Sequence, residues 1–211
     1  MDELAREYTI AFFGRTLLMH GDRPEGMRWT AAGQTARYEA LLGICDSLEG
    51  RSVLDYGCGK GDFLAFLLGR GIVTDYTGID INPAVIDLAR RKFPQCRFEV
   101  SDGGADGIRD FFDYIILCGV FNLKVQGLDD LIRRTLRLLF SRCRRGLVFN
   151  ALSAHAPCKD YELHYVSPEE LSEFALRELS PFVALRPGAA THDFNLFVYR
   201  EAQSSSGCST R

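Results

Sequence analysis

The chain has 211 residues, of which 46% are hydrophobic, enough for the core of a single α/β domain. Its formal net charge of −3 gives no overall attraction to nucleic acid or to an anionic membrane. The start Met-Asp-Glu has no signal-peptide pattern, no apolar run is long enough to cross a bilayer, and the seven cysteines form no close CxxC pair, which together indicate a cytoplasmic protein with reduced thiols.

Two helices are predicted ahead of the core. An amphipathic helix is expected at 2–20, a loop at 21–30 and a second helix at 31–48. On the first helix, Tyr8 and Phe12 are expected to pack in the core, and closing a ligand cleft is the alternative for both.

A buried strand, a tight turn and a helix start are predicted from VLDYGCGKGDF at 53–63. Gly57, Gly59 and Gly61 remove side chains where the backbone bends, so a ligand can lie against it. A dinucleotide-binding loop needs a small residue where this chain has Asp62, whose carboxylate would repel a diphosphate. The loop therefore favours a ligand that is not strongly anionic, which argues against a nicotinamide oxidoreductase, while a plain strand-to-helix turn stays an alternative.

A second strand and helix are predicted at 76–93, where the strand ends at Asp80 and Asn82 can cap the helix. Asp80 lies about twenty residues beyond the glycines, the spacing at which a carboxylate binds ribose hydroxyls. A carboxylate suits a diol because it can accept from both hydroxyls at once. The alternative is that Asp80 only forms a turn.

Two further strands are predicted at 97–102, ending in Asp102, and at 112–123, which is almost wholly apolar. Apolar strands that alternate with helices indicate a parallel sheet covered on both faces, with ligands bound beyond the carboxyl ends of the strands. Asp55, Asp80 and Asp102 all fall at or near those ends. Three acids around one crevice favour a cationic or amine-bearing ligand.

The remaining elements are a helix at 128–143, a strand at 146–152, a helix at 168–178 and strands at 182–186 and 194–200. Because the connection between the last two strands is short and begins with Pro-Gly, these strands are expected to pair antiparallel. The core is predicted to span residues 51–200, and the Ser-rich segment 201–211 is expected to be a flexible tail.

With these motifs in place, residues 28–200 resemble a class I S-adenosylmethionine-dependent methyltransferase. The resemblance rests on D-x-G-x-G-x-G after the first strand, acids that close the second and third strands, and an apolar fourth strand that enters a loop of small residues. It implies a single Rossmann-like, doubly wound, seven-stranded sheet with an antiparallel last strand, preceded by N-terminal helices. It also implies S-adenosyl-L-methionine as the cofactor and no metal.

The resemblance assigns roles in cofactor binding to residues that match the family's motifs. Gly57, Gly59 and Gly61 would pass under the methionine part, and Asp80, followed by Ile81, would hold the ribose diol. Asp102 and the backbone at Cys118 would meet the adenine amino group, and Asp55 would lie near the ammonium end.

Two residues ahead of the core have both a functional and a structural interpretation. If residues 1–50 form a lid, as a preceding helix commonly does in methyltransferases, Arg37 can pair with the cofactor's carboxylate. Otherwise Arg37 is a surface residue on a packing helix. Trp29 is either a plate over the cofactor or substrate, or a core residue.

Catalytic groups are expected in the loops beyond the fifth and sixth strands, where His155, His164 and His192 fall. A histidine can deprotonate an amine or hydroxyl, and we expect at least one of these to serve the substrate, with His192 and His164 favoured. Tyr165 is a candidate hydrogen-bond partner. Asn122, in the loop after the fourth strand, is a candidate for orienting the substrate.

A small-molecule acceptor methylated at an N or O atom is the favoured hypothesis, because the chain has little length beyond the core for docking a macromolecule. Methylation of RNA or protein, and a non-catalytic cofactor-binding module, are the alternatives. The loop CGVFNL lacks the Asn/Asp-Pro-Pro-aromatic signature of many enzymes that methylate nucleobases or amides. Six arginines are interpreted as a solvated face and not as an RNA surface: Arg133, Arg134, Arg137, Arg142, Arg144 and Arg145. The oligomeric state is left open.

Overall fold

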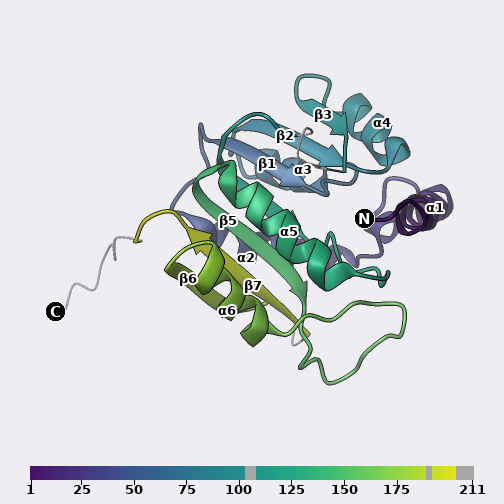
Figure 1. The fold of residues 1–211 in the computed structure, drawn as a ribbon. Helices are drawn as coiled ribbons and strands as arrows, with labels where there is room; N and C mark the ends of the chain where they lie inside the picture. The colour runs from purple at the N-terminus through teal and green to yellow at the C-terminus, as the bar shows by residue number, and fades with distance from the viewer. Residues whose placement is uncertain (103–107, 189–191, 203–211) are drawn as a thin grey trace.

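A computed structural model describes residues 1–102, 108–188 and 192–202. In this part of the chain a seven-stranded sheet forms the centre of the molecule (Figure 1), with the strand order β3-β2-β1-β4-β5-β7-β6. The strands are β1 Ser52–Tyr56, β2 Asp75–Asp80, β3 Arg97–Val100, β4 Phe112–Cys118, β5 Cys143–Leu152, β6 Phe182–Pro187 and β7 Asp193–Tyr199. Strands β1 to β5 are parallel, and β7 pairs antiparallel with both β5 and β6. The predicted doubly wound sheet with its reversed last strand is confirmed.

Helices cover both faces of the sheet (Figure 1). They are α1 Glu3–His20, α2 Ala31–Leu41, α3 Asp62–Gly69, α4 Pro83–Lys92, α5 Leu128–Ser141 and α6 Pro168–Glu178, with short 3-10 turns η1 Pro24–Met27 and η2 Leu42–Ile44. Helices α5 and α6 pack on one face, and α2, α3 and α4 on the other. Alternate residues of β4 enter the two cores, so this strand is buried on both sides.

Several predicted boundaries are wrong by a few residues. The helix expected at 31–48 leaves the α conformation after Leu41, because Gly43 weakens it and the Arg186 guanidinium donates to the Gly43 carbonyl at 3.2 Å. The strand expected at 97–102 ends at Val100, which leaves Asp102 just beyond it. The loop expected at 21–30 contains the turn η1.

Contrary to the expectation, the first helix does not pack in the core. Helix α1 lies beyond the carboxyl ends of the strands (Figure 1), and its one buried residue is Ala5. Leu4 is 77% exposed and Tyr8 is 47% exposed. Phe12 belongs to neither core and instead lines a cavity, so the cleft-closing alternative holds for Phe12.

Candidate functional site

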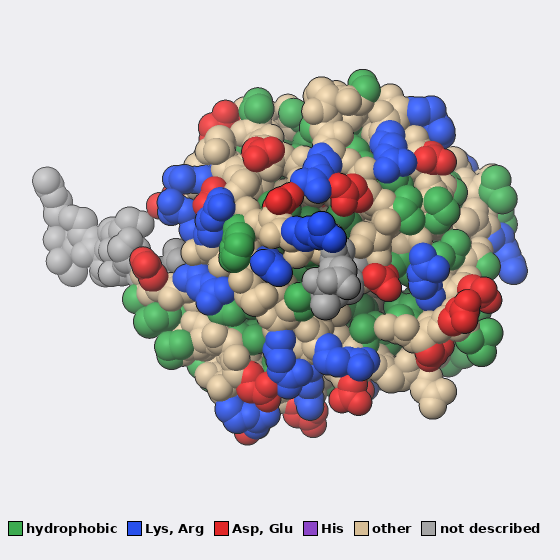
Figure 2. Space-filling view, turned by 45° about the horizontal axis from the view of Figure 1, so that its top comes forward, with side chains coloured by type: hydrophobic (Ala, Val, Ile, Leu, Met, Phe, Trp, Pro, Cys, Tyr) green, Lys and Arg blue, Asp and Glu red, His purple; other side chains and the backbone are tan. Residues whose placement is uncertain are grey.

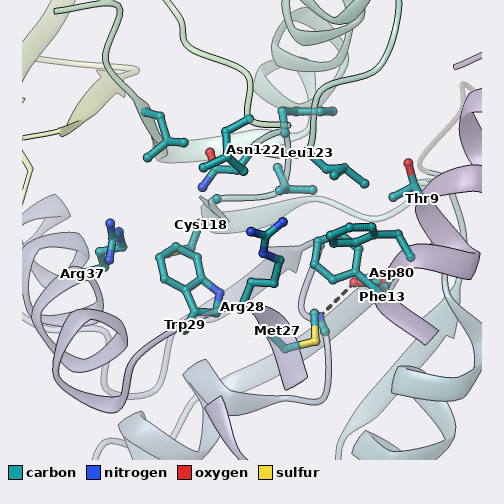
Figure 3. A pocket seen from close by; sticks show the side chains of 18 of the residues that line it. Thr9, Phe13, Met27, Arg28, Trp29, Arg37, Asp80, Cys118, Asn122 and Leu123 are labelled. Atoms are coloured by element: carbon teal, nitrogen blue, oxygen red, sulfur yellow. Dashed lines mark hydrogen bonds between the residues drawn. The ribbon is translucent and has the colours of Figure 1, made fainter. Parts of the chain in front are cut away.

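A cavity of about 1230 Å³ opens at the carboxyl ends of the parallel strands. Its floor is the loop after β1 and the ends of β2 and β4, and its walls come from α1, the segment 27–38 and the loop between β5 and α6 (Figure 3). Pockets for one small ligand have volumes of about 300–1000 Å³. The cavity therefore has room for two small ligands side by side.

Bare backbone forms part of the floor at Gly57 and Gly59. A Cβ at Gly57 would lie 2.3 Å from Cγ2 of Val120, and one at Gly59 would lie 2.9 Å from Cε of Met27. Both residues line the cavity and have positive φ, which glycine adopts without strain. Gly61 differs, because it lies outside the lining, with the ring of Phe93 3.1 Å from the position of its missing Cβ. Its role is to start α3 and to admit this ring.

Asp80 is fixed by main-chain donors. Its Oδ2 accepts from the Gly59 N–H at 3.0 Å, and its Oδ1 accepts from the Asn82 N–H at 2.9 Å. Burial raises the pKa of this carboxyl, although these hydrogen bonds favour its charged form. Asp80 lines the cavity (Figure 3), and Ile81 belongs to the same lining. One carboxylate therefore holds the glycine loop in place and faces the ligand space.

Asp55 is a buried acid at the same floor, 2% exposed. Its Oδ2 accepts from the Tyr76 hydroxyl at 2.5 Å, and burial raises its pKa to about 7. Within the described residues no Lys or Arg forms an ion pair with Asp55. A buried carboxylate without a cation is costly, so this position is suited to a ligand that brings a positive charge.

Asp102 and Cys118 complete the floor as the sequence predicts. Both line the cavity, and the Tyr56 hydroxyl fixes the Asp102 main chain by donating to its carbonyl at 2.8 Å. Burial raises the pKa of the Cys118 thiol, which favours its protonated form.

The carboxylate of Asp62 is paired with a lysine, which the sequence alone does not show. The Lys60 ammonium, 1% exposed, lies 2.6 Å from Asp62 Oδ2 and 3.2 Å from Asp22 Oδ1. Because its charge is paired, Asp62 repels a diphosphate less than an unpaired carboxylate would. Lys60, to which no role was assigned, ties the segment after α1 to the glycine loop. No spacing in the sequence indicates a contact with Asp22, 38 residues away.

Trp29 and Arg37 stack together at the edge of the cavity (Figure 3). The Arg37 guanidinium lies 4.4 Å from the Trp29 ring centroid, and Cζ2 of Trp29 is 2.6 Å from where a Cβ on Gly119 would lie. Half-buried Trp29 is therefore a wall of the cavity and not a core residue. Arg37 is buried, with its Nε 2.6 Å from Oδ2 of Asp193. A contact between Arg37 and a cofactor carboxylate stays a prediction.

Of the three rim histidines, only His192 lines the cavity among the described residues. Its Nε2 lies 3.0 Å from an Arg37 nitrogen, and because arginine can only donate, Nε2 is the acceptor. His164 points away to Asp129 at 3.1 Å, and exposed His155 pairs with Glu169 at 2.9 Å.

Tyr165 and Asn122 line the cavity as expected. The Tyr165 hydroxyl accepts from the Asp160 N–H at 2.8 Å. The main-chain carbonyl of Asn122 accepts from the His164 N–H at 2.9 Å. Residues 163 and 165 face inward while residue 164 faces outward, as in any extended segment, which explains why His164 misses the cavity. We therefore do not propose a catalytic role for His164.

The wall opposite the floor was not foreseen in the sequence. Arg28 lies at its centre (Figure 3), with its guanidinium 3.1 Å from Glu162 and 3.9 Å from Asp160, and 5.3 Å from the Phe12 ring centroid. These contacts join α1, the segment before α2 and the loop before α6. The residues are far apart in the sequence, so no local pattern indicates that they meet.

The arginines of α5 lie on a solvated face, as interpreted from the sequence. Arg137 and Arg133 pair with Glu178 and Glu170 of α6, at 2.5 and 3.7 Å. On the face that Figure 2 presents, basic and acidic side chains are interspersed. In the described part of the chain, no helix is both long and apolar enough for a transmembrane span.

Comparisons with known proteins give the family and the fold of the chain. A family model described as a methyltransferase domain matches residues 53–141. A candidate methyltransferase of Mycobacterium tuberculosis is 33% identical over 162 residues, covering 74% of this chain and 94% of that protein. A magnesium-protoporphyrin O-methyltransferase of Rhodobacter capsulatus is 36% identical over 87 residues, 39% of this chain and 38% of its own. Among solved structures, magnesium protoporphyrin IX methyltransferase from Synechocystis, with bound S-adenosylmethionine, has a TM-score of 0.72 at 16% identity and covers 95% of this chain and 98% of its own.

Proposed function

The chain belongs to the class I S-adenosylmethionine-dependent methyltransferase family, and from this premise we propose that it methylates an N or O atom of a small-molecule acceptor. Its cofactor is S-adenosyl-L-methionine. The observation that carries the proposal is the large cavity with backbone and carboxylates on its floor and room left beside them.

The residues on the floor fit this cofactor. Asp55 is a buried carboxylate to which no Lys or Arg of the described residues forms an ion pair, which suits the cationic ammonium end. Asp80 faces the cavity from the end of β2, where a carboxylate can accept from a ribose diol. Gly57 and Gly59 offer bare backbone that no side chain could replace, and Asp102 and the backbone at Cys118 are assigned to the adenine.

The protein's own contribution is to position the acceptor and keep water out. The bound cofactor supplies a methyl group already activated on a sulfonium. Met27, Arg28 and Trp29 cover the cavity from the segment before α2, which supports the interpretation of residues 1–50 as a lid (Figure 3). Tyr165 and Asn122 offer polar groups on the acceptor side.

A small-molecule acceptor is supported by the walls of the cavity. Arg28 links the segment before α2 to the loop before α6 through Glu162, so these two walls are joined across the space. Relatives named ribosomal protein L11 methyltransferase match over 68 to 89 residues, 22 to 30% of their own length, and so support only the shared domain. A cytoplasmic location is also a proposal, supported by six free cysteines in the described residues.

Two measurements test the proposed function. The purified protein is denatured and its supernatant is searched by mass spectrometry for S-adenosylmethionine and S-adenosylhomocysteine, which we expect to be retained. The protein is then incubated with S-adenosylmethionine that carries a labelled methyl group and, separately, with the small-molecule, protein and RNA fractions of a cell extract. Label in the small-molecule fraction supports the proposal. Label confined to protein or RNA contradicts the acceptor class, and label in no fraction favours a non-catalytic module.

A further inference from the structure

The glycine loop contains a buried ammonium that the proposed function does not use. Lys60 is 1% exposed, and its Nζ lies 2.6 Å from Asp62 Oδ2 and 3.2 Å from Asp22 Oδ1. A buried ammonium is costly unless acids compensate its charge, so these two contacts decide where the side chain lies. Gly59 and Asp62 line the cavity, but Lys60 lies outside the described lining. Lys60 can therefore act on a ligand only through its partners.

A second lysine strengthens this link. The Lys92 ammonium of α4 lies 2.9 Å from Asp22 Oδ1 and 3.3 Å from Asp62 Oδ1, so two cations and two acids alternate. Asp62 is two residues from Lys60 and compensates its charge within the loop. Asp22 is 38 residues from Lys60 and is not needed for that local balance. The contacts of Asp22 thus join the N-terminal segment to the glycine loop and to α4.

Asp22 lies where α1 ends and the wall formed by the segment before α2 begins. The turn η1 follows directly, and Met27 and Trp29 line the cavity (Figure 3). The Thr16 hydroxyl donates to the Gly26 carbonyl at 2.7 Å, which fixes this turn to α1. Because the segment is short and anchored in this way, a movement of Asp22 also moves the wall.

The wall lies directly against the glycine loop. Cε of Met27 is 2.9 Å from where a Cβ on Gly59 would be, so no side chain fits between them. The Gln34 side chain of α2 donates to Asp62 Oδ2 at 3.0 Å, which fastens the far end of the wall to the carboxylate that also pairs with Lys60. A nucleoside bound beside this contact would be covered by the wall, and the wall has to lift before the nucleoside leaves.

Salt can distinguish the two ion pairs of Lys60. The pair with Asp62 is shielded, since the two side chains are 1% and 13% exposed, whereas the Asp22 side chain is 46% exposed. Screening by salt is strong for exposed charges and weak for buried ones. Salt should therefore loosen the link between the wall and the loop before it disturbs the loop itself.

We propose that Asp22 and Lys60 are positioning residues for the cofactor, because their ion pair holds segment 22–29 closed over the glycine loop. The pair thereby sets how fast S-adenosylhomocysteine leaves after methyl transfer. Asp22, like Lys60, lies outside the described lining, so neither side chain is assigned a contact with the nucleoside. The inference rests on the proposed function and deepens it.

The test measures the dissociation of S-adenosylhomocysteine at two salt concentrations. Protein loaded with the labelled nucleoside is chased with excess unlabelled nucleoside in about 0.1 M and about 1 M salt, over which the Debye length falls from about 10 Å to about 3 Å. In low salt, Asp22→Asn should release the nucleoside about 10-fold faster than the wild type, equivalent to about 1.4 kcal/mol. High salt should speed release from the wild type by about 5-fold and from Asp22→Asn by at most about 2-fold, because the charge that salt screens is gone.

The matched control is Glu39→Gln. Glu39 pairs with Arg70, which joins α2 to the end of α3 outside the described lining, and the Glu39 side chain is 43% exposed. Both substitutions remove one negative charge from the N-terminal segment, so they change the net charge of the protein equally. Glu39→Gln should keep the dissociation rate and the salt dependence of the wild type.

A second variant tests the partner of Asp22. In protein that already carries Lys60→Met, Asp22→Asn should change the rate by at most about 3-fold, since only the contact with Lys92 is then lost. An equal effect of Asp22→Asn in both backgrounds, a rate in Asp22→Asn within about 2-fold of the wild type, or the same acceleration in Glu39→Gln would overturn the inference. Binding of S-adenosylhomocysteine by the wild type is measured first, so its failure counts against the proposed function, whereas unchanged dissociation counts against the ion pair alone.

Discussion

The floor of the cavity and its opposite walls are built in different ways. The floor comes from one stretch of chain, 53–82, together with Asp102 and the end of β4, and backbone hydrogen bonds such as the one from Gly59 to Asp80 fix its shape. The walls come from segments far apart in the sequence, and Arg28 and Glu162, which hold them together, are 134 residues apart. The floor is therefore a rigid, negatively charged cradle, and the walls are an assembly of loops held by partly exposed contacts.

The largest expected effect is on the floor, from Asp80→Ala. This change removes a carboxylate that accepts two main-chain N–H groups and faces the ligand. Hydrogen bonds to charged groups contribute about 1.5–3 kcal/mol each, so cofactor affinity should fall by about 10- to 100-fold. Calorimetry with S-adenosylhomocysteine measures the loss. The control is Asp75→Ala at the exposed opposite end of β2, and equal affinity in both variants would remove the assignment of Asp80.

The next effect is expected where floor and wall meet, from Gly119→Ala. The new Cβ would lie 2.6 Å from the Trp29 ring, at a residue whose φ is +65°, so the ring must move and the backbone is strained by about 1–2 kcal/mol. Trp29 is the one tryptophan of the chain, so its fluorescence reports the movement directly.

We expect a shifted emission maximum and about 10-fold weaker cofactor binding in that variant. Gly69→Ala is the control, because nothing lies within 4 Å of the added Cβ. An unchanged spectrum in Gly119→Ala would show that Trp29 does not form this wall.

A third prediction concerns Asp55, where one substitution should raise the stability of the ligand-free protein and lower its affinity for the cofactor. Burial raises the pKa of Asp55 from 3.8 to about 7, so the folded state holds a proton that the unfolded state releases between these values. Stability of the ligand-free protein therefore falls as pH rises from about 4 to about 7. Asp55→Asn, which keeps an acceptor for Tyr76, should raise Tm at pH 8 by roughly 2–4 °C for each kcal/mol gained, with no gain near pH 4.

The same substitution should weaken cofactor binding, because the cationic end loses its carboxylate. Thermal unfolding between pH 4 and pH 8, with and without S-adenosylmethionine, measures both effects. A variant that is less stable than the wild type at pH 8 would contradict the buried-charge account of Asp55.

A smaller effect is expected at the walls, from Arg28→Met and Glu162→Gln. Both side chains are about one-third exposed, so their pairing should contribute about 0.2–1 kcal/mol in a double-mutant cycle. Dissociation of S-adenosylhomocysteine should become at most about 5-fold faster if residues 1–50 act as the proposed lid, because the lid would then open more easily. Arg137→Met, which breaks an ion pair with Glu178 far from the cavity, should leave dissociation unchanged. If Arg28→Met and Arg137→Met change the dissociation rate equally, Arg28 does not hold the proposed lid closed.

The smallest effect is expected from His164→Ala. This side chain pairs with Asp129 and lies outside the lining, so turnover should stay within about 2-fold of the wild type. A large loss of turnover with normal cofactor affinity would show that His164 takes part in catalysis, and that it does not point away from the cavity when substrate is bound.

The parts of the site that lie within a short stretch of chain could be predicted from the sequence. The glycine turn, the acid at the end of β2 and the antiparallel last strand follow from local patterns, because the position of a strand end in a parallel sheet is set by topology. The wall could not be predicted in this way. Lys60 and Arg28 meet acids that are distant in sequence, and Phe12 was expected in the core because amphipathic spacing does not say which surface a helix covers.

The central claim is that the acidic floor selects a cationic sulfur nucleoside over an anionic one. Calorimetric titration of the wild-type protein with S-adenosylmethionine, S-adenosylhomocysteine, ADP and NAD tests it most directly. We predict one-to-one binding of the two sulfur nucleosides and at least about 100-fold weaker binding of the two diphosphates, a difference of about 2.7 kcal/mol. Binding of ADP or NAD as tight as that of S-adenosylmethionine would contradict the account.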